Sequence, residues 1–212
     1  MDILYQDDHV LVVNKPSGLA VHRGWARDRV TAVGLAGRLA KRHVSPVHRL
    51  DRGTSGVLLF AFAPEIVRTL QASFAEGIHR VYWALVRGPA PEHEVVDHPI
   101  PRRPGGPRVD AITEIRLLGR FERYSLVEAR PRTGRLHQVR RHLKHLSLPI
   151  IGDSKYGKSE HNRLLRDRFG LARLALHAKS LDVPHPVRDE RLHVEAPIPE
   201  DLAGPLRAMG LL

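Results

Sequence analysis

One acidic residue stands inside a basic, glycine-containing segment of the chain. The segment HRLDRGTSG covers residues 48–56 and places Asp51 between Arg49 and Arg52. Because neighbouring positive charge favours the ionised form of a carboxyl group, we expect Asp51 to be a carboxylate at neutral pH, able to act as a nucleophile or a base. The same residues would also suit a salt-bridged aspartate in an ordinary turn, so this segment alone leaves both interpretations open.

A tyrosine follows in a segment of strand-like alternation. In RVYWALVRG, residues 80–88, Tyr82 would most simply pack in a sheet. Beside a nucleic-acid site, the ring of such a tyrosine can stack on a base while its hydroxyl exchanges a proton. Taken in isolation, Tyr82 is better explained by packing.

The segment RPRTGRLHQVRRHLKH, residues 130–145, predicts a basic turn that leads into a helix. Arg140 is four residues after Leu136 and three before Leu143, so it borders the apolar side of that helix, where a guanidinium can pair with a buried carboxylate. The outward-facing basic residues suit RNA phosphates, or simply form a solvated face; they are Arg135, Arg141, Lys144 and His145. Because His137, His142 and His145 fall on different faces of a helix, we expect no metal site.

A fourth segment matches a phosphate-binding pattern. GDSKYGKS, residues 152–159, fits GxxxxGK[ST], the loop that cradles phosphates in NTPases. The chain that remains after Ser159 is too short for the further parallel strands and the second metal-binding strand of such an enzyme. We therefore expect the match to be accidental and the protein to use no nucleotide cofactor.

The amino-acid composition narrows the classes of binding partner and the cellular compartment that we expect for the protein. The 212 residues carry 34 Lys and Arg against 23 Asp and Glu, and the net charge of +11 favours a polyanionic partner, with a merely basic surface as the alternative. Cysteine is absent, which excludes disulfides, thiolate metal sites and cysteine catalysis. No apolar run is long enough to span a membrane, and the start MDILYQDDHV has acids where a signal peptide has basic residues, so we expect a cytoplasmic protein.

Hydrophobic periodicity and turn residues predict an α+β fold with a mixed, mainly antiparallel sheet. The expected strands are 3–13 in two short pieces, 57–63, 80–86, 111–118, 124–129, 174–183 and 191–196. Helices are expected from Ala32 with Leu35, Ala36 and Leu39, from Pro64 with an inward face of Ile66, Val67, Leu70 and Phe74, from Leu136 to Leu146, and over 200–212. Residues 89–107, rich in Pro, Gly and charge, are expected to form a long connection between two sub-lobes.

Several motifs together resemble those of the RluA family of pseudouridine synthases. The matching stretches are YQDDHVLVVNKPSGLAVH, HRLDRGTSG, RVYWALV, TGRLHQVRRHL, LPIIGDSKYG and LALHAKSL, in this order over about residues 3–197. The resemblance implies a pseudouridine synthase fold, in which helices flank the sheet around a central active-site cleft. It also implies a single catalytic domain over residues 1–212, with no separate N-terminal RNA-binding domain. Arg80 stands where many relatives have lysine, which keeps the charge.

The resemblance further implies roles for individual residues. Asp51 matches the catalytic aspartate, Tyr82 the active-site tyrosine, and Arg140 the arginine that pairs with the aspartate. Leu176 matches a leucine that lines the uracil pocket, and Arg49 resembles an arginine that enters RNA where the target base has left. We also expect the RNA substrate to be contacted by Arg52, Arg135 and His137.

The implied reaction isomerises a uridine within RNA, with tRNA favoured over rRNA, and uses neither metal nor cofactor. Uracil leaves its stack, loses its N1–C1′ bond, turns in a closed pocket and rejoins the sugar through C5. Asp51 is expected to attack either C6 of the ring or C1′ of the sugar, Tyr82 to help remove the C5 proton, and Arg140 to keep the carboxylate charged. The lack of a second paired acid argues against ordinary glycoside hydrolysis. We expect a monomer, and a non-catalytic RNA-binding protein remains the alternative.

Overall fold

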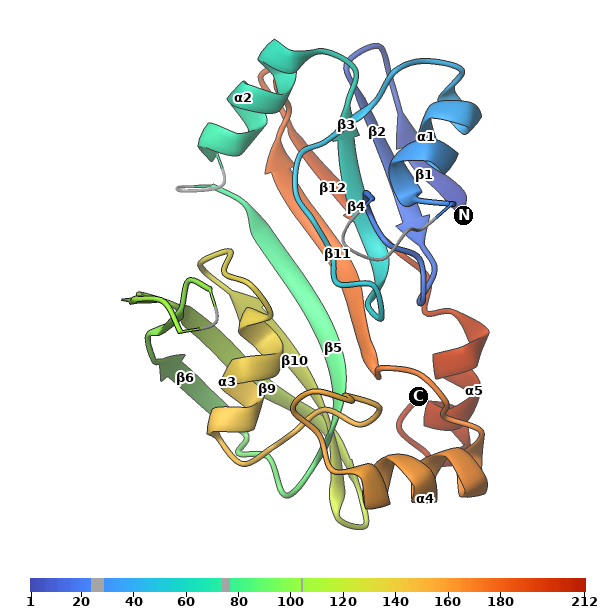
Figure 1. The fold of residues 1–212 in the computed structure, drawn as a ribbon, viewed down its shortest axis with the longest axis vertical. Coiled ribbons are helices and arrows are strands. Elements are labelled where there is room, and N and C mark those ends of the chain that lie inside the picture. Colours follow the sequence, from blue (N-terminus) through green and yellow to red (C-terminus); the bar gives the residue numbers. More distant parts are fainter. Residues whose placement is uncertain (24–28, 74–76, 104) are drawn as a thin grey trace. The chain divides into compact units, whose positions relative to one another are not determined.

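The structure, a computed structural model, describes residues 1–23, 29–73, 77–103 and 105–212, and it divides into two compact units (Figure 1). Unit 1 comprises Met1–His79 and Ala178–Pro197, and unit 2 comprises Arg80–His177 and Ile198–Leu212. The chain passes from one unit to the other after residues 79, 177 and 197, whereas residues 89–107, expected to connect two sub-lobes, lie inside unit 2.

The strands of unit 1 form a sheet in the order β1 (Asp2–Gln6), β2 (Val10–Lys15), β4 (Ser55–Ala61) and β11 (Leu176–Pro184). The short β3 (Ser45–Pro46) pairs with β4, and β12 (Arg191–Glu195) pairs with β11. β1 with β2 and β2 with β4 are antiparallel pairs, so the expected N-terminal hairpin is confirmed. All of β4 is buried, as is typical of a central strand covered on both faces.

Two helices cover the strands of unit 1. α1 (Ala32–Ala40) contacts β2, and α2 (Pro64–Ser73) contacts β3 and β4. Both begin where the sequence predicts, α1 after a cap in which Thr31 Oγ1 accepts the Gly34 N–H at 3.2 Å. α1 is buried through Ala32 and Ala36, whereas Leu39, expected on its apolar side, is exposed. α2 is buried through Leu70, and Phe74, expected on the same face, lies outside the described residues.

Unit 2 contains an antiparallel sheet in the order β5 (His79–Arg87), β10 (Tyr124–Pro131), β9 (Ile112–Phe121) and β6 (His93–Asp97). A two-stranded hairpin, β7 (Ile100–Pro101) with β8 (Arg108–Val109), follows β6. The expectation of a long connection over residues 89–107 is therefore wrong. The segment contains β6, which pairs with β9, and β7, which pairs with β8.

Three helices complete unit 2. α3 (Gln138–His145) lies across β9 and β10 (Figure 1), and α4 (Ser159–Phe169) and α5 (Glu200–Ala208) follow later in the chain. α3 begins at Gln138, so Leu136, expected inside this helix, precedes it and is exposed. α4 was not predicted, because its sequence SEHNRLLRDRF buries only His161 and Leu165 and so carries a weak apolar pattern.

Each unit has its own hydrophobic core. The core of unit 1 is formed mainly by Val10, Val12, Val57, Leu59, Leu181 and Val183, and that of unit 2 by Leu85, Val127, Leu143, Ile150, Leu165 and Leu202. The predicted α+β class with a mixed, mainly antiparallel sheet and flanking helices is thus confirmed. Among the residues that the structure describes, no helix combines the length and hydropathy that crossing a membrane requires.

Candidate active site

The residues expected to do chemistry fall in both units, and each group is described within its own unit. Unit 1 contains Asp51 with Arg49 and Arg52. Unit 2 contains Tyr82, Arg135, His137, Arg140 and Leu176.

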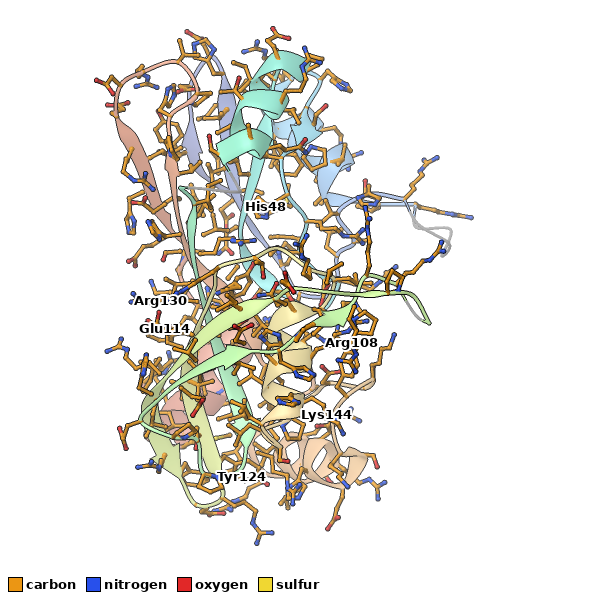
Figure 2. The ribbon with its side chains drawn as sticks, turned by 90° about the vertical axis from the view of Figure 1, so that its left-hand side faces the viewer. His48, Arg108, Glu114, Tyr124, Arg130 and Lys144 are labelled. Carbon is orange, nitrogen blue, oxygen red and sulfur yellow. The ribbon has the colours of Figure 1, made fainter. Side chains whose placement is uncertain are left out.

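Asp51 lies in the loop between β3 and β4. Its side chain is half-buried, while Arg49 and Arg52 on either side are exposed. The Thr54 N–H donates to the Asp51 carbonyl at 3.0 Å and closes a tight turn directly after the carboxylate. On the strand side, His48 Nε2 accepts the Leu59 N–H at 3.2 Å, which fastens the beginning of the loop to β4 (Figure 2). The acid therefore stands in a loop that is fixed at both ends.

A fully buried lysine braces this loop. Lys15, the last residue of β2, donates from Nζ to the carbonyl oxygens of Pro16 at 2.9 Å, Leu19 at 2.8 Å and Arg52 at 3.2 Å. A buried ammonium is costly unless polar partners replace its water, and these three carbonyls do so. The Lys15 ammonium group is thus hydrogen-bonded to the residue that follows Asp51.

Two more hydrogen bonds join the same pair of turns. The Gly18 N–H donates to the Arg52 carbonyl at 2.9 Å, and Ser17 Oγ donates to the Gly53 carbonyl at 2.7 Å. Sequence reasoning did not single out Lys15 or Ser17. The available signal was the turn sequence NKPSG directly after a buried strand.

Gly56 determines how β4 starts. Its φ is +112°, and a Cβ at this position would lie 2.1 Å from the carbonyl oxygen of Ala178 on β11. No other residue type fits such a close backbone approach. The second glycine of the Asp51 motif is therefore required by packing within unit 1.

In unit 2, Tyr82 lies on β5 opposite Ala129 of β10. It is half-buried and packs against the core of this unit, which agrees with the packing role that its sequence context favours. Two residues earlier, Arg80 donates from Nη2 to the carbonyls of Pro131 at 3.3 Å and Thr133 at 3.0 Å. The strand that carries Tyr82 is thus bonded to the loop that leads into α3.

The start of α3 is organised by one buried glutamine. Gln138 Oε1 accepts the Thr133 hydroxyl at 2.8 Å and the Arg135 N–H at 3.0 Å. Its Nε2 donates to the Ile112 carbonyl at 2.9 Å and to Thr113 Oγ1 at 3.0 Å. All the hydrogen-bonding capacity of the amide group is used, so it fixes both the TGR turn and the first turn of α3 on β9.

Arg140 forms a bidentate ion pair with Asp153. Its Nε is 2.7 Å from Asp153 Oδ2 and its Nη2 is 2.9 Å from Oδ1, and the two side chains are 11% and 0% exposed. Burial by itself would raise the pKa of Asp153, but the hydrogen bonds from Arg140 and from the Tyr156 and Lys155 N–H groups outweigh it and hold the pKa below its usual value. Sequence reasoning predicted a carboxylate partner for Arg140 but did not name Asp153.

The GDSKYG turn, which resembles a phosphate-binding loop in sequence, contains an anionic group of its own, the Asp153 carboxylate. The N–H groups of Lys155 and Tyr156 donate to Asp153 Oδ1 at 2.9 and 3.0 Å. In an NTPase, successive N–H groups of this kind face a phosphate. Here the carboxylate of Asp153 takes up both donors, so the structure supports the expectation that the pattern match is accidental. Gly152, at φ +77°, approaches the backbone of Arg173 too closely for any side chain.

Tyr156 links three basic residues of the α3 region. Its hydroxyl is 3.1 Å from Arg141 Nε and 3.2 Å from His137 Nδ1, and its ring centroid is 5.1 Å from Arg140 Cζ. His137, expected to contact RNA, is therefore engaged with Tyr156, and it adopts a left-handed backbone conformation with φ +54°. Arg135 is exposed and donates from Nε to the Asp110 carbonyl at 3.1 Å.

The two other histidines of α3 have separate surroundings. His142 is fully buried between Thr113 Oγ1 at 2.9 Å and the His98 carbonyl at 3.0 Å, and burial lowers its pKa. His145 is exposed and stacks on His98 with 3.8 Å between ring centroids. Arg108, whose Nη1 is 3.1 Å from His98 Nε2, and Lys144 are exposed basic side chains (Figure 2).

Leu176, expected to line the uracil pocket, is the first residue of β11 and is 3% exposed in the core of unit 2. Its carbonyl oxygen accepts Nη2 of Arg173 at 3.2 Å, and Arg173 also pairs with Asp201 at 2.9 Å. Burial lowers the pKa of Arg173, while hydrogen bonding and attraction to Asp201 act in the opposite direction. The backbone at Leu176 is thus held by a buried, ion-paired arginine.

Two solved human structures share this fold. The protein titled Human RNA Pseudouridylate Synthase Domain Containing 4 has a TM-score of 0.81 and 28% identity, with 99% of this chain and 93% of that chain covered. Human RNA Pseudouridylate Synthase Domain Containing 1 has a TM-score of 0.78 and 26% identity, with 95% of this chain and 85% of that chain covered. The fold is accordingly that of the pseudouridine synthases.

Sequence comparison identifies the family. The family model described as RNA pseudouridylate synthase matches residues 9–145. A relative named tRNA pseudouridine synthase C in Vibrio cholerae is 37% identical, with 99% of this chain and 96% of the relative covered. Relatives of the same name in Salmonella typhimurium and Pectobacterium carotovorum subsp. carotovorum are 40% and 38% identical over 94% and 92% of this chain, which spans 86% and 58% of their lengths. This chain therefore belongs to the RNA pseudouridylate synthase family, and the resemblance to the RluA family is confirmed.

Proposed function

We propose that this pseudouridine synthase isomerises a specific uridine of tRNA and that Asp51 is its nucleophile. The observation that carries the choice of tRNA is the naming of its relatives as tRNA pseudouridine synthase C, at 37% identity over nearly the whole of both chains in the Vibrio cholerae case. The assignment of Asp51 rests on the family motif HRLDRGTSG and on the bracing of its loop by Lys15 and Ser17.

Tyr82 and Arg140 are the other two catalytic residues of the proposal. Tyr82 stacks on the detached uracil and helps to remove the C5 proton. As the family resemblance implies, Arg140 keeps the Asp51 carboxylate charged and oriented. Leu176 gives the uracil an apolar wall.

Basic residues provide the contacts to the RNA backbone. Arg49 fills the place of the flipped base, and Arg52, Arg135 and His137 contact the neighbouring backbone. Because these contacts are ionic and the protein has a net charge of +11, its binding to RNA is sensitive to the salt concentration. The proposal includes a monomer that acts in the cytoplasm, where unmodified tRNA is available.

The test is pseudouridine mapping after incubation of the purified protein with unmodified tRNA and with rRNA. The proposal expects a single modified uridine in tRNA, and product confined to rRNA would contradict the substrate assignment. The Asp51→Asn variant should bind tRNA with the affinity of the wild type but form no product. Turnover by this variant at the normal rate would refute the assignment of the nucleophile, and absence of product with any RNA would favour a non-catalytic RNA-binding protein.

A further inference from the structure

The Arg140 guanidinium is held along one edge by two parallel hydrogen bonds. Nε and Nη2 face Oδ2 and Oδ1 of Asp153 at 2.7 and 2.9 Å, and the arginine side chain is only 11% exposed. Such a fork fixes the plane of the guanidinium as well as its position, which a single bond does not. The remaining edge of the group is therefore aimed in one defined direction.

Asp153 is itself immobilised. Its Oδ1 accepts the N–H groups of Lys155 and Tyr156, and its side chain is fully buried. The turn around it is fastened to α4, because Asn162 Oδ1 accepts the Gly152 N–H at 2.8 Å and Asn162 Nδ2 donates to the Asp153 carbonyl at 3.4 Å. The carboxylate is thus a rigid support and not a mobile counter-ion.

A second support for Arg140 is the ring of Tyr156. The Tyr156 ring centroid is 5.1 Å from Arg140 Cζ, and Arg141 holds the Tyr156 hydroxyl at 3.1 Å. Because the same short turn supplies both Asp153 and Tyr156, one structural element constrains Arg140 through an ion pair and through an aromatic ring.

We propose that Asp153 is a positioning residue for pseudouridine formation, whose carboxylate orients the Arg140 guanidinium toward its catalytic role. The inference rests on the proposed function of Arg140 and adds to it a residue to which the family motifs had given no role. It also assigns a role to the GDSKYG turn. The turn holds a fixed carboxylate against α3, whereas a phosphate-binding loop of similar sequence would hold a phosphate.

The Asp153→Asn variant separates this role from support of the turn. An asparagine oxygen in place of Oδ1 still accepts from Lys155 and Tyr156, whereas an NH₂ group in place of Oδ2 opposes Arg140 Nε. The expected result is a fall of about 100-fold in the single-turnover rate on tRNA, with KM within about twofold of the wild type, because misplacement of a catalytic group affects the chemical step. The thermal unfolding midpoint is measured alongside.

A matched control lies in the same unit. Glu128 is a buried carboxylate that pairs with Arg130 at 2.9 Å and Arg116 at 3.4 Å, apart from the proposed machinery. Glu128→Gln should retain the wild-type rate even where it lowers the unfolding midpoint as much as Asp153→Asn does. Equal loss of rate in the two variants would contradict a specific role for Asp153.

Chemical rescue tests whether Asp153 acts through Arg140. Arg140→Ala should lose activity, and millimolar guanidinium should restore part of it by binding against Asp153. The Arg140→Ala/Asp153→Asn double variant should show no rescue and should be no slower than Arg140→Ala alone, because the two residues work as a pair. Additive losses, rescue without Asp153, or a wild-type rate in Asp153→Asn would overturn the inference. If Arg140→Ala or Asp51→Asn kept the wild-type rate, the proposed catalytic role of the substituted residue would itself be refuted.

Discussion

The Lys15 ammonium lies 3.2 Å from the carbonyl oxygen of Arg52, 37 residues further along the chain. A fully buried cation at the end of β2 is thereby bonded to the peptide that follows the proposed nucleophile. The loop that carries Asp51 is therefore held by this bond as well as by its own turn.

Replacing Lys15 with Met should weaken both stability and catalysis. The change leaves three carbonyls without their common donor and removes a buried side chain's hydrogen bonds, so the free energy of unfolding should fall by about 3 kcal/mol. The rate on tRNA should fall because the Asp51 loop loses a support. Urea unfolding and single-turnover assays measure the two effects. Lys179→Met is the control: Lys179 forms an ion pair with the exposed Glu195, so its loss should cost less than about 1 kcal/mol. Equal losses in the two variants would contradict the brace.

Gly56→Ala should be strongly destabilising. The new Cβ would lie 2.1 Å from the Ala178 carbonyl oxygen at a φ of +112°, so the free energy of unfolding should fall by about 3 kcal/mol or more. Gly170→Ala offers a comparison, because its φ is +72° with open space around it, and it should cost about 1 kcal/mol. Thermal or urea unfolding distinguishes the two, and similar costs would show that the close approach to β11 is unimportant.

Gln138→Leu should disturb the start of α3. The substitution removes four hydrogen bonds, two of them to β9, at a cost of about 3 kcal/mol. Hydrogen exchange of the first α3 amides should accelerate relative to the wild type. Gln71→Leu, which removes one bond to the Val47 carbonyl at an exposed position, should cost about 1 kcal/mol or less. Unchanged exchange in Gln138→Leu would refute the proposed organising role.

The Asp7 carboxylate should give unit 1 an acid-sensitive contribution to stability. Burial by itself would raise the pKa of Asp7, but hydrogen bonds outweigh it and hold the pKa far below its usual value; the donors are the His9 and Val10 N–H groups, His185 and Tyr5. Because the folded-state pKa is lowered, this contribution is complete above the unfolded value of about 4 and is lost as the pH falls further.

The Asp7→Asn variant measures that contribution. It should be less stable than the wild type at neutral pH, and the difference in urea midpoint should shrink progressively as the pH falls from about 5 to about 2, because the carboxyl takes up a proton there in the unfolded wild type while it stays ionised in the folded protein. A difference that stays constant over this range would show that the carboxylate charge contributes nothing.

The motifs and the main strands could be read from the sequence, because apolar alternation and turn residues act locally. β4 and β10 lie close to where the pattern places them. Helix ends were less predictable: α3 begins at Gln138 and not at Leu136, because the glutamine side chain and the left-handed His137 define its first turn. α4 was missed because it turns mostly charged residues toward solvent.

The residues that support the proposed site could not be identified from the sequence, for a different reason. Lysine is rarely buried, so nothing in its type suggests that Lys15 would sit at the centre of a hydrogen-bonded turn. Asp153 is 13 residues from Arg140, and only the folded turn brings the two together. A sequence pattern identifies groups that react, whereas the groups that hold them depend on contacts between distant segments.

The division of the chain also has a consequence for the order of folding. Unit 1 needs Ala178–Pro197 to supply β12 and most of β11, and these residues are synthesised only after the whole of Arg80–His177. Leu181 and Val183 from the late segment share a core with Val57 and Leu59 from the early one. On the ribosome, the sheet beside the loop that carries Asp51 therefore stays incomplete until residues 178–197 have been made, so the proposed nucleophile is fixed in place only after the whole of Arg80–His177 has been synthesised.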